Sequence, residues 1–156
     1  MLYPEKLSIL NRTFSLVKDF AEEYPADLVA EKPDAVSFSA NEIIYHLLEV
    51  EELWQRRIHQ LLNEERPYFE RINPDELAKE HHYNEHDFFE GIMELQKSRE
   101  DTIELVTALS EDELSRKATH SRFGEMDVYR ILDIIADHEL QHLRQMERTL
   151  MLVEGR

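Results

Sequence analysis

The chain contains no cysteine among its 156 residues. This absence excludes disulfides, thiolate metal ligands and a cysteine nucleophile of the protein's own. Glycine and proline are also scarce, with 3 and 5 residues, and every proline lies at or before Pro74. Few helix-breaking residues, together with many Glu, Leu, Lys and Arg, favour helices over strands. We therefore expect an all-α fold, which a sheet of three or more strands would contradict.

Long hydrophobic runs are missing as well. No segment approaches the ~20 apolar residues of a membrane-spanning helix, and the N-terminus has no apolar stretch of signal-peptide length. The 18 Lys and Arg residues are outnumbered by 34 Asp and Glu, which gives a net charge of -16. Because such a surface repels phosphates, nucleic acid and anionic membranes are poor candidate partners. We expect a cytoplasmic protein with a single domain over residues 1–156 and a small-molecule substrate.

Apolar residues recur at helical spacing in four segments of the chain. They predict a four-helix bundle of long antiparallel helices near residues 4–23, 40–62, 85–109 and 128–153. Ser39 and Glu42 fit a capping box at the start of the second helix. Asn84 and Asp127 are the expected N-caps of the third and last helices.

Residues 63–83 form the longest irregular stretch, with Pro67, Pro74 and many charged residues. A short helical turn is expected at residues 74–79. Loops of this length are unusual in a small domain and are often functional. This one could cover the mouth of a site, or it could be an inert surface excursion.

His138 and His142 carry the strongest chemical signal in the sequence. They stand four residues apart in the last predicted helix, so they lie on one face and one turn apart. At about 100° per residue, His142 falls within the apolar stripe of that helix and His138 lies beside its edge. Two inward imidazoles at this spacing can bind one metal ion together, and a satisfied core histidine is the alternative for each.

The same pair belongs to the sequence HELQH at residues 138–142, which matches the H-E-x-x-H pattern of zinc proteases, with Glu139 as general base. Such proteases take their third ligand from further along the chain, and only 14 residues follow His142. The expected lack of strands also removes their substrate cleft. The context argues against a protease, and a third ligand should come from upstream.

His46 is the best upstream candidate. It lies in the second predicted helix on the shoulder of the core stripe, near Val50 and Leu53. Three imidazoles leave at least one position for water or substrate, which is the composition of a catalytic zinc site. The alternative for His46 is a buried histidine bonded to a backbone carbonyl. The other histidines lie in loops, charged stretches or off the core stripe, and no role is assigned to them: His59, His81, His82, His86 and His120.

Two segments resemble the DinB-like (YfiT-like) metalloenzyme superfamily. Residues 39–46, SANEIIYH, are similar to its serine-capped second helix with one histidine. Residues 138–145, HELQHLRQ, are similar to its His-x-x-x-His-x-x-Gln last helix, and the order of motifs and helices agrees over nearly the whole chain. The resemblance implies a four-helix bundle with His46, His138 and His142 around one divalent ion, zinc, nickel or a similar metal.

The resemblance also implies a chemistry. Members with known activity are mostly transferases that use a low-molecular-weight thiol such as bacillithiol, mycothiol or glutathione, and others are metal-dependent hydrolases. A thiol on a cation held by neutral imidazoles would lose its proton near neutral pH and could attack a small electrophile. A hydrolase would use the ion to generate hydroxide from water, and Glu139 or Glu42 could serve as base in either case. We expect the transferase; the alternatives are the hydrolase and a non-catalytic metal-binding stress-response protein.

A homodimer is expected on two grounds. The resemblance implies one, and the helix faces carry more apolar residues than one core needs, such as Ile44, Leu48 and Leu62. The sequence leaves open which metal, thiol and second substrate are used.

Overall fold

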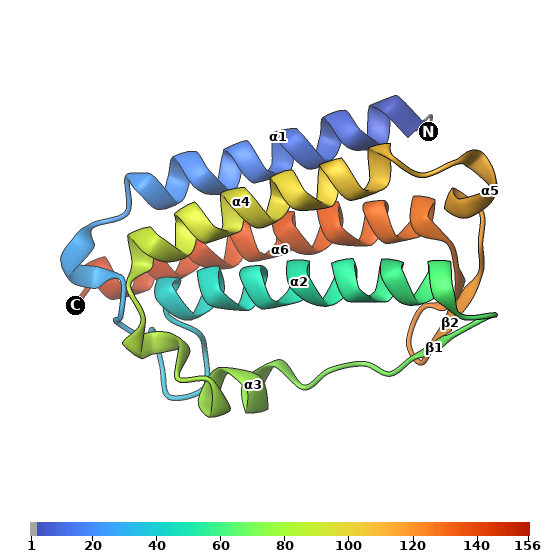
Figure 1. Ribbon diagram of the computed structural model, residues 1–156. Coiled ribbons are helices and arrows are strands. Elements are labelled where there is room, and N and C mark those ends of the chain that lie inside the picture. Colours follow the sequence, from blue (N-terminus) through green and yellow to red (C-terminus); the bar gives the residue numbers. More distant parts are fainter. Residues whose placement is uncertain (1–2) are drawn as a thin grey trace.

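Four long helices form the bundle in Figure 1, which shows the computed structural model and describes residues 3–156. The helices are α1 (Tyr3–Glu22), α2 (Ala40–Asn63), α4 (Phe88–Thr107) and α6 (Val128–Glu154). Helix α2 packs against α4 and α6, and α1 packs against the same two helices. No helix among the described residues is long and apolar enough to cross a membrane. The predicted all-α four-helix bundle is confirmed. The expectation that all its helices are antiparallel was wrong, because the packed pairs α1 with α6 and α2 with α4 each run parallel (Figure 1).

The capping residues explain where α2 and α6 begin. The Ser39 hydroxyl accepts a hydrogen bond from the Glu42 backbone N–H at 3.1 Å, and the Glu42 carboxylate accepts one from the Ser39 N–H at 3.0 Å. This reciprocal pair is the predicted capping box, which satisfies two backbone donors at the helix end. Asp127 caps α6 by accepting from the Arg130 N–H at 2.9 Å. Both starts agree with the prediction.

The start of the third long helix was predicted three residues too early. Asp87, and not Asn84, caps α4, because its carboxylate accepts from the Glu90 N–H at 2.8 Å. Asn84 lies in the short 3-10 helix η2 (Tyr83–Glu85). There it accepts a hydrogen bond from the Ser39 hydroxyl at 2.6 Å and donates one to the Ala30 carbonyl at 3.0 Å. The asparagine therefore ties η2 to the start of α2.

A small sheet, which the sequence analysis did not predict, closes one end of the bundle where α2 ends and α6 begins (Figure 1). Its three strands contain two or three residues each: β1 (Tyr68–Phe69), β2 (Ala118–His120) and β3 (Gly124–Met126). Strand β1 pairs with β2 in parallel, and β2 pairs with β3 antiparallel. The expectation that no three-stranded sheet would be present was therefore wrong. The strands are too short to give a recognisable pattern in the sequence, and they lie in the connections between the four predicted helices.

The connection between α2 and α4 lies along the outside of α2 (Figure 1). It contains β1, η2 and the predicted helical turn, α3 (Pro74–Glu80). The remaining short elements are η1 (Ala26–Leu28) and α5 (Glu111–Leu114). The connection is therefore partly ordered by secondary structure of its own.

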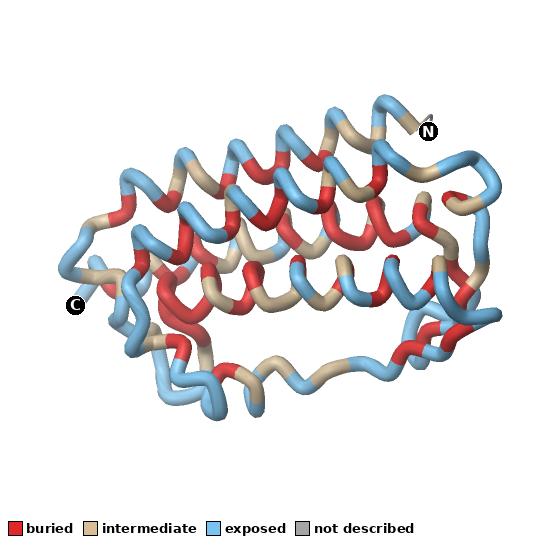
Figure 2. Tube along the Cα trace, viewed as in Figure 1, coloured by how far each residue is buried: buried red, intermediate tan, exposed pale blue. Residues whose placement is uncertain are grey.

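Buried residues follow the inward sides of all four helices (Figure 2). Helix α2 buries more than one face, because α4 and α6 cover different sides of it. Ile44 is fully buried and Leu48 is 8% exposed within one chain. The use of these two residues as spare apolar surface for a dimer was therefore wrong. The homodimer itself stays a prediction.

Candidate metal centre

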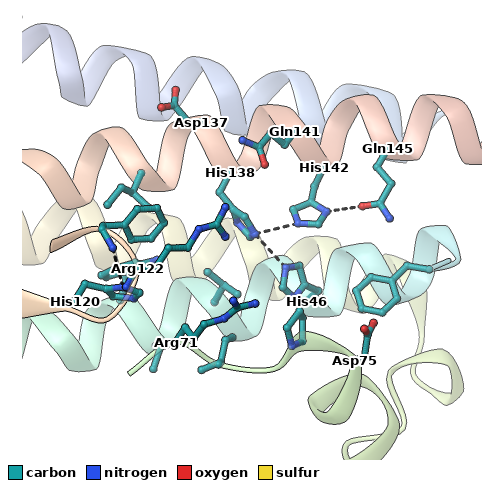
Figure 3. Close-up of a pocket in the computed structure, with 18 of the residues that line it drawn as sticks. His46, Arg71, Asp75, His120, Arg122, Asp137, His138, Gln141, His142 and Gln145 are labelled. Carbon is teal, nitrogen blue, oxygen red and sulfur yellow. Dashed lines mark hydrogen bonds between the residues drawn. The ribbon is translucent and has the colours of Figure 1, made fainter. Parts of the chain in front are cut away.

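Three histidines from two helices meet inside the bundle. His46 comes from α2, and His138 and His142 lie one turn apart on α6. The Nε2 atom of His138 lies 3.1 Å from that of His46 and 3.0 Å from that of His142. The rings meet edge to face, with interplanar angles of 66°, 64° and 77° (Figure 3). The three Nε2 atoms therefore converge, and we call these residues the histidine cluster.

Neighbouring groups orient two of the three rings. Gln145 Oε1 accepts a hydrogen bond from Nδ1 of His142 at 2.7 Å. Because an amide oxygen only accepts, Nδ1 holds the proton of neutral His142, and Nε2 keeps its lone pair. His46 packs against Phe38 with ring centroids 5.7 Å apart, and its Nδ1 has no hydrogen-bond partner among residues 3–156. Packing, rather than a hydrogen bond at Nδ1, therefore holds the His46 ring.

All three histidines are neutral at pH 7. Burial, followed by the neighbouring His142 and His138, lowers the pKa of His46 from 6.5 to about 2. Burial and His142 lower the pKa of His138 to about 3. Burial also lowers the pKa of His142, against a smaller opposite effect of its bond to Gln145. The neutral imidazole is the form that ligates a metal ion.

The donor set and its spacing fit a divalent metal ion. Two ligand atoms on a tetrahedral zinc ion, each ~2.0–2.1 Å from the metal, lie about 3.3 Å apart. The measured separations of 3.0 and 3.1 Å are close to this value. Imidazole nitrogens suit zinc, nickel, copper and iron. The group in residues 3–156 consists of these three side chains, so an ion there would keep a position for a further ligand.

The histidine cluster lies in the wall of a pocket of about 580 Å³. This volume is in the range of small-molecule sites. Helices α2 and α6 form one part of the wall, and three connecting segments complete it, residues 36–38, 71–75 and 120–123. The long connection between α2 and α4 thus covers the site, which was one of its two expected roles.

Glu139 follows His138 directly but faces another part of the bundle. Its carboxylate accepts hydrogen bonds from the Arg99 guanidinium at 2.8 and 3.1 Å and from the Thr13 hydroxyl at 2.6 Å. Successive helical residues are about 100° apart, so Glu139 points between the helices while His138 lines the pocket. Glu139 is 2% exposed and is absent from the pocket wall. The expectation that it could serve as base was therefore wrong.

Arg99 joins Glu139 to a second carboxylate. Its guanidinium donates to both oxygens of Glu51 at 2.9 Å and to the Leu10 carbonyl at 2.6 Å. The Thr102 hydroxyl also donates to Glu51, at 2.6 Å. These contacts connect all four long helices, and we call the set the Arg99 cluster: Leu10, Thr13, Glu51, Arg99, Thr102 and Glu139.

Glu42 is also occupied elsewhere. Its carboxylate completes the capping box of α2 and lies 3.2 Å from the Lys32 ammonium. It does not line the pocket, so the suggestion that it could act as base was wrong as well. The wall contains two other carboxylates, Asp75 and Asp137. In Figure 3, Asp75 points toward the histidine cluster from below, whereas Asp137 leaves α6 on the side away from His138.

The remaining histidines divide into two groups. His59, His81, His82 and His86 are exposed. His120, to which no role was assigned, is 5% exposed and lines the pocket. The sequence analysis also missed Asp75 and the four arginines of the wall, Arg57, Arg71, Arg122 and Arg130. Only the pocket geometry singles them out, because no short motif in the sequence joins them.

A four-helix bundle with three converging histidines beside a small-molecule pocket defines a class of helical proteins with a candidate metal centre. The sequence comparison gives the family. The chain matches the DinB superfamily over residues 9–146, and it belongs to that family.

Individual proteins are also similar to this chain. YuaE from Bacillus subtilis (strain 168) is 28% identical over 136 residues, which are 80% of this chain and 84% of that protein. YfiT from Bacillus subtilis, described as a probable metal-dependent hydrolase with an unusual four-helix bundle topology, is 16% identical, with a TM-score of 0.84 over 99% of this chain and 90% of that one. A mycothiol-dependent maleylpyruvate isomerase is 13% identical, with a TM-score of 0.77 over 94% of this chain and 61% of that one. At these identities the two structures show the fold.

Proposed function

We propose that the protein is a divalent-metal-dependent enzyme in which His46, His138 and His142 hold the ion. We further propose that it is a transferase that joins a low-molecular-weight thiol, of the bacillithiol type, to a small electrophile. The observation that carries the proposal is the convergence of three neutral Nε2 atoms in the wall of a 580 Å³ pocket. A purely structural metal site would be closed by protein ligands.

A divalent ion in the histidine cluster would supply positive charge that lowers the pKa of a thiol or water bound beside it. The protein's own residues have distinct tasks in this scheme. His46, His138 and His142 stay neutral, so they do not diminish that charge. Gln145 holds the His142 ring with Nε2 toward the site. Such a hydrogen bond at the outer nitrogen of a ligand typically raises metal affinity.

Asp75 is the carboxylate that we assign to proton transfer. It lies in the first turn of α3. It lines the pocket and points toward the histidine cluster in Figure 3. A carboxylate in this place can accept a proton from an incoming thiol, directly or through one water. The thiol must come from a co-substrate, because the chain has no cysteine.

Metal analysis and a conjugation assay test the proposal together. The purified protein should contain about one equivalent of zinc or nickel. It should accelerate the reaction of 1-chloro-2,4-dinitrobenzene with at least one of bacillithiol, mycothiol and glutathione, as followed by absorbance. Chelation should abolish the rate, and the metal should restore it. His81→Ala serves as control, since it also deletes an imidazole, and an equal loss in His81→Ala and His142→Ala would contradict the assignment.

A metal-dependent hydrolase is the second candidate. It is supported by the description of YfiT as a probable metal-dependent hydrolase, and it would use the same three histidines with water in place of the thiol. Ester and amide substrates offered without any thiol distinguish the two activities. A bound metal without turnover of either kind of substrate would favour the non-catalytic metal-binding protein.

Two further expectations belong to this proposal. We propose that the protein forms a homodimer and that it works in the cytoplasm. The homodimer rests on the family resemblance, since Ile44 and Leu48 are buried within one chain. Light scattering at micromolar concentration tests it, and a mass of about 19 kDa, set by the 18.7 kDa chain, would contradict it.

A further inference from the structure

Basic side chains outnumber acidic ones in the wall of the pocket, although acidic residues predominate in the whole chain. The whole chain has 18 basic and 34 acidic residues. The wall has two carboxylates, Asp75 and Asp137, but four guanidinium groups, those of Arg57, Arg71, Arg122 and Arg130. Basic residues are a minority overall and a majority here. This local excess of cations calls for a ligand of opposite charge.

Arg57 is the most buried of the four, at 6% exposed. Its guanidinium lies 4.7 Å from the centre of the Trp54 ring and 5.2 Å from that of Phe69, and it donates one hydrogen bond to the Glu70 carbonyl at 2.6 Å. No carboxylate of residues 3–156 lies within ion-pair distance of it, in contrast to Arg99, which lies between two. Burying a charge is costly unless it is paired, so the remaining donors of Arg57 are suited to an anion from outside the chain.

His120 adds a neutral donor beside this arginine. Its Nδ1 accepts backbone N–H groups from Arg122 at 3.0 Å and from Phe123 at 3.4 Å. The proton of the neutral ring is therefore on Nε2, which is a donor. The ring lies against Trp54, with centroids 6.0 Å apart, and lines the pocket. Nε2 donates to no residue in the described part of the chain.

Arg71 and Arg122 extend from the two connecting segments and direct their guanidinium groups toward the histidine cluster (Figure 3). The segments are joined, because the Arg71 backbone N–H donates to the Ser121 hydroxyl at 2.9 Å. Neither arginine forms an ion pair within residues 3–156. In this view Arg71 and Arg122 lie between the histidine cluster and His120 (Figure 3).

We propose that the pocket takes a substrate, or a thiol co-substrate, with an anionic oxygen group, a carboxylate or a phosphate, held by Arg57, Arg71 and Arg122 with His120, while the reacting atom lies at the histidine cluster. The planar guanidinium fork matches both oxygen groups in a bidentate manner. His46 and Arg57 are 11 residues apart, about 16 Å along α2, so the ligand is elongated. This inference rests on the proposed function only for which end reacts; the anion site rests on the arginines.

Fluorescence titration tests the anion site, because Trp54 is the only tryptophan of the chain and packs against both Arg57 and His120. Malate represents the carboxylate, glycerol phosphate the phosphate, and glycerol the neutral control. Since an anion can also ligate a metal ion, each titration is made on the metal-loaded protein and on the protein after chelation and desalting. Saturable binding of malate or glycerol phosphate in both forms, without binding of glycerol, is expected. The tighter of the two anions identifies the group.

Arginine variants locate the binding. Arg71→Gln and Arg122→Gln concern exposed side chains, so the fold should be kept, and each should raise the dissociation constant about tenfold or more, the loss of one charged hydrogen-bonding partner. Arg148→Gln on the exposed side of α6, outside the pocket wall, should leave it unchanged. The inference is overturned if neither anion binds, or if all three variants bind alike. Anion binding by a protein that retains no metal would instead overturn the proposed function and leave this inference standing.

Discussion

The Arg99 cluster and the histidine cluster are both buried polar groups, and His138 and Glu139 place them next to each other on α6. In the Arg99 cluster one cation donates to two carboxylates and a backbone carbonyl, and two threonine hydroxyls donate to the same carboxylates, all within 3.1 Å. In the histidine cluster three imidazole nitrogens converge without an opposite charge. Buried polar groups of complementary charge stabilise a fold, whereas three metal-ligating nitrogens of one kind that converge indicate a ligand. We therefore expect the Arg99 cluster to stabilise the fold and the histidine cluster to bind a ligand.

The largest effect is expected from breaking the Arg99 cluster. Arg99→Met leaves Glu51 and Glu139 buried without their common cation. The free energy of unfolding should fall by about 3–5 kcal/mol, the usual cost of removing one partner of a buried ion pair. Urea denaturation followed by circular dichroism measures it, with Arg148→Gln as the exposed control. Equal stability of the two variants would contradict the structural role of the cluster.

A change in the histidine cluster should weaken metal binding strongly and alter the stability of the metal-free protein little. His142→Ala removes one of three ligands and should weaken metal binding by more than about 100-fold, since even outer hydrogen-bond partners contribute 10–100-fold. The stability of the metal-free protein should change far less than in Arg99→Met. Competition with a chromogenic chelator gives the affinity. Unchanged affinity in His142→Ala would remove this residue from the site.

A smaller loss of metal affinity is expected when Gln145, the hydrogen-bond partner of His142, is replaced. Gln145→Leu keeps all three imidazoles but removes the acceptor at 2.7 Å from His142 Nδ1. Metal affinity should fall about 10–100-fold. Gln141→Leu, a change of the same kind in the same pocket wall, removes no hydrogen bond to a histidine and should bind metal as the wild type does. If both variants behave alike, the orienting role of Gln145 is refuted.

The smallest effect concerns pH. The pKa of His46 is lowered from 6.5 to about 2 in the folded protein, so the unfolded chain binds more protons at every pH between these values. Stability is therefore retained above pH 6.5 and lost as the pH falls below it. Between pH 6 and 5, His46 should cost metal-free protein about 1 kcal/mol of unfolding free energy. The variant His46→Gln should show a slope shallower by that amount in urea titrations, and an equal slope would argue against a buried neutral His46.

The same contrast explains how far the sequence could predict the molecule. Helix α2 and the His138–His142 pair could be predicted because a capping box and an i, i+4 spacing are local patterns. The sequence also sufficed to predict that Glu139 points away from the histidine cluster, because successive residues of a helix are about 100° apart. Asn84 was chosen as a cap because it suits that role in isolation, and its bonds to Ser39 and Ala30 depend on tertiary contacts.

The pocket wall lay beyond sequence reasoning. Arg57, Arg71 and His120 come from a helix, a connecting segment and a strand that are far apart in the chain, and only folding brings them to one cavity. The place of Asp75 in the pocket wall could not be predicted for the same reason. Ile44 and Leu48 were misassigned because the number of neighbours that cover α2 is a property of the packed bundle.

The hydrogen bond between Arg71 and Ser121 joins two connecting segments that carry part of the charged wall, while the histidines lie on α2 and α6. Arg71 and Arg122 are thus encoded apart from the three histidines, whereas Arg57 shares α2 with His46. Descendants of such a protein can exchange the wall residues of segments 71–75 and 120–123 without changing the caps of the long helices. Selection could in this way diversify the substrates of one bundle while conserving its chemistry.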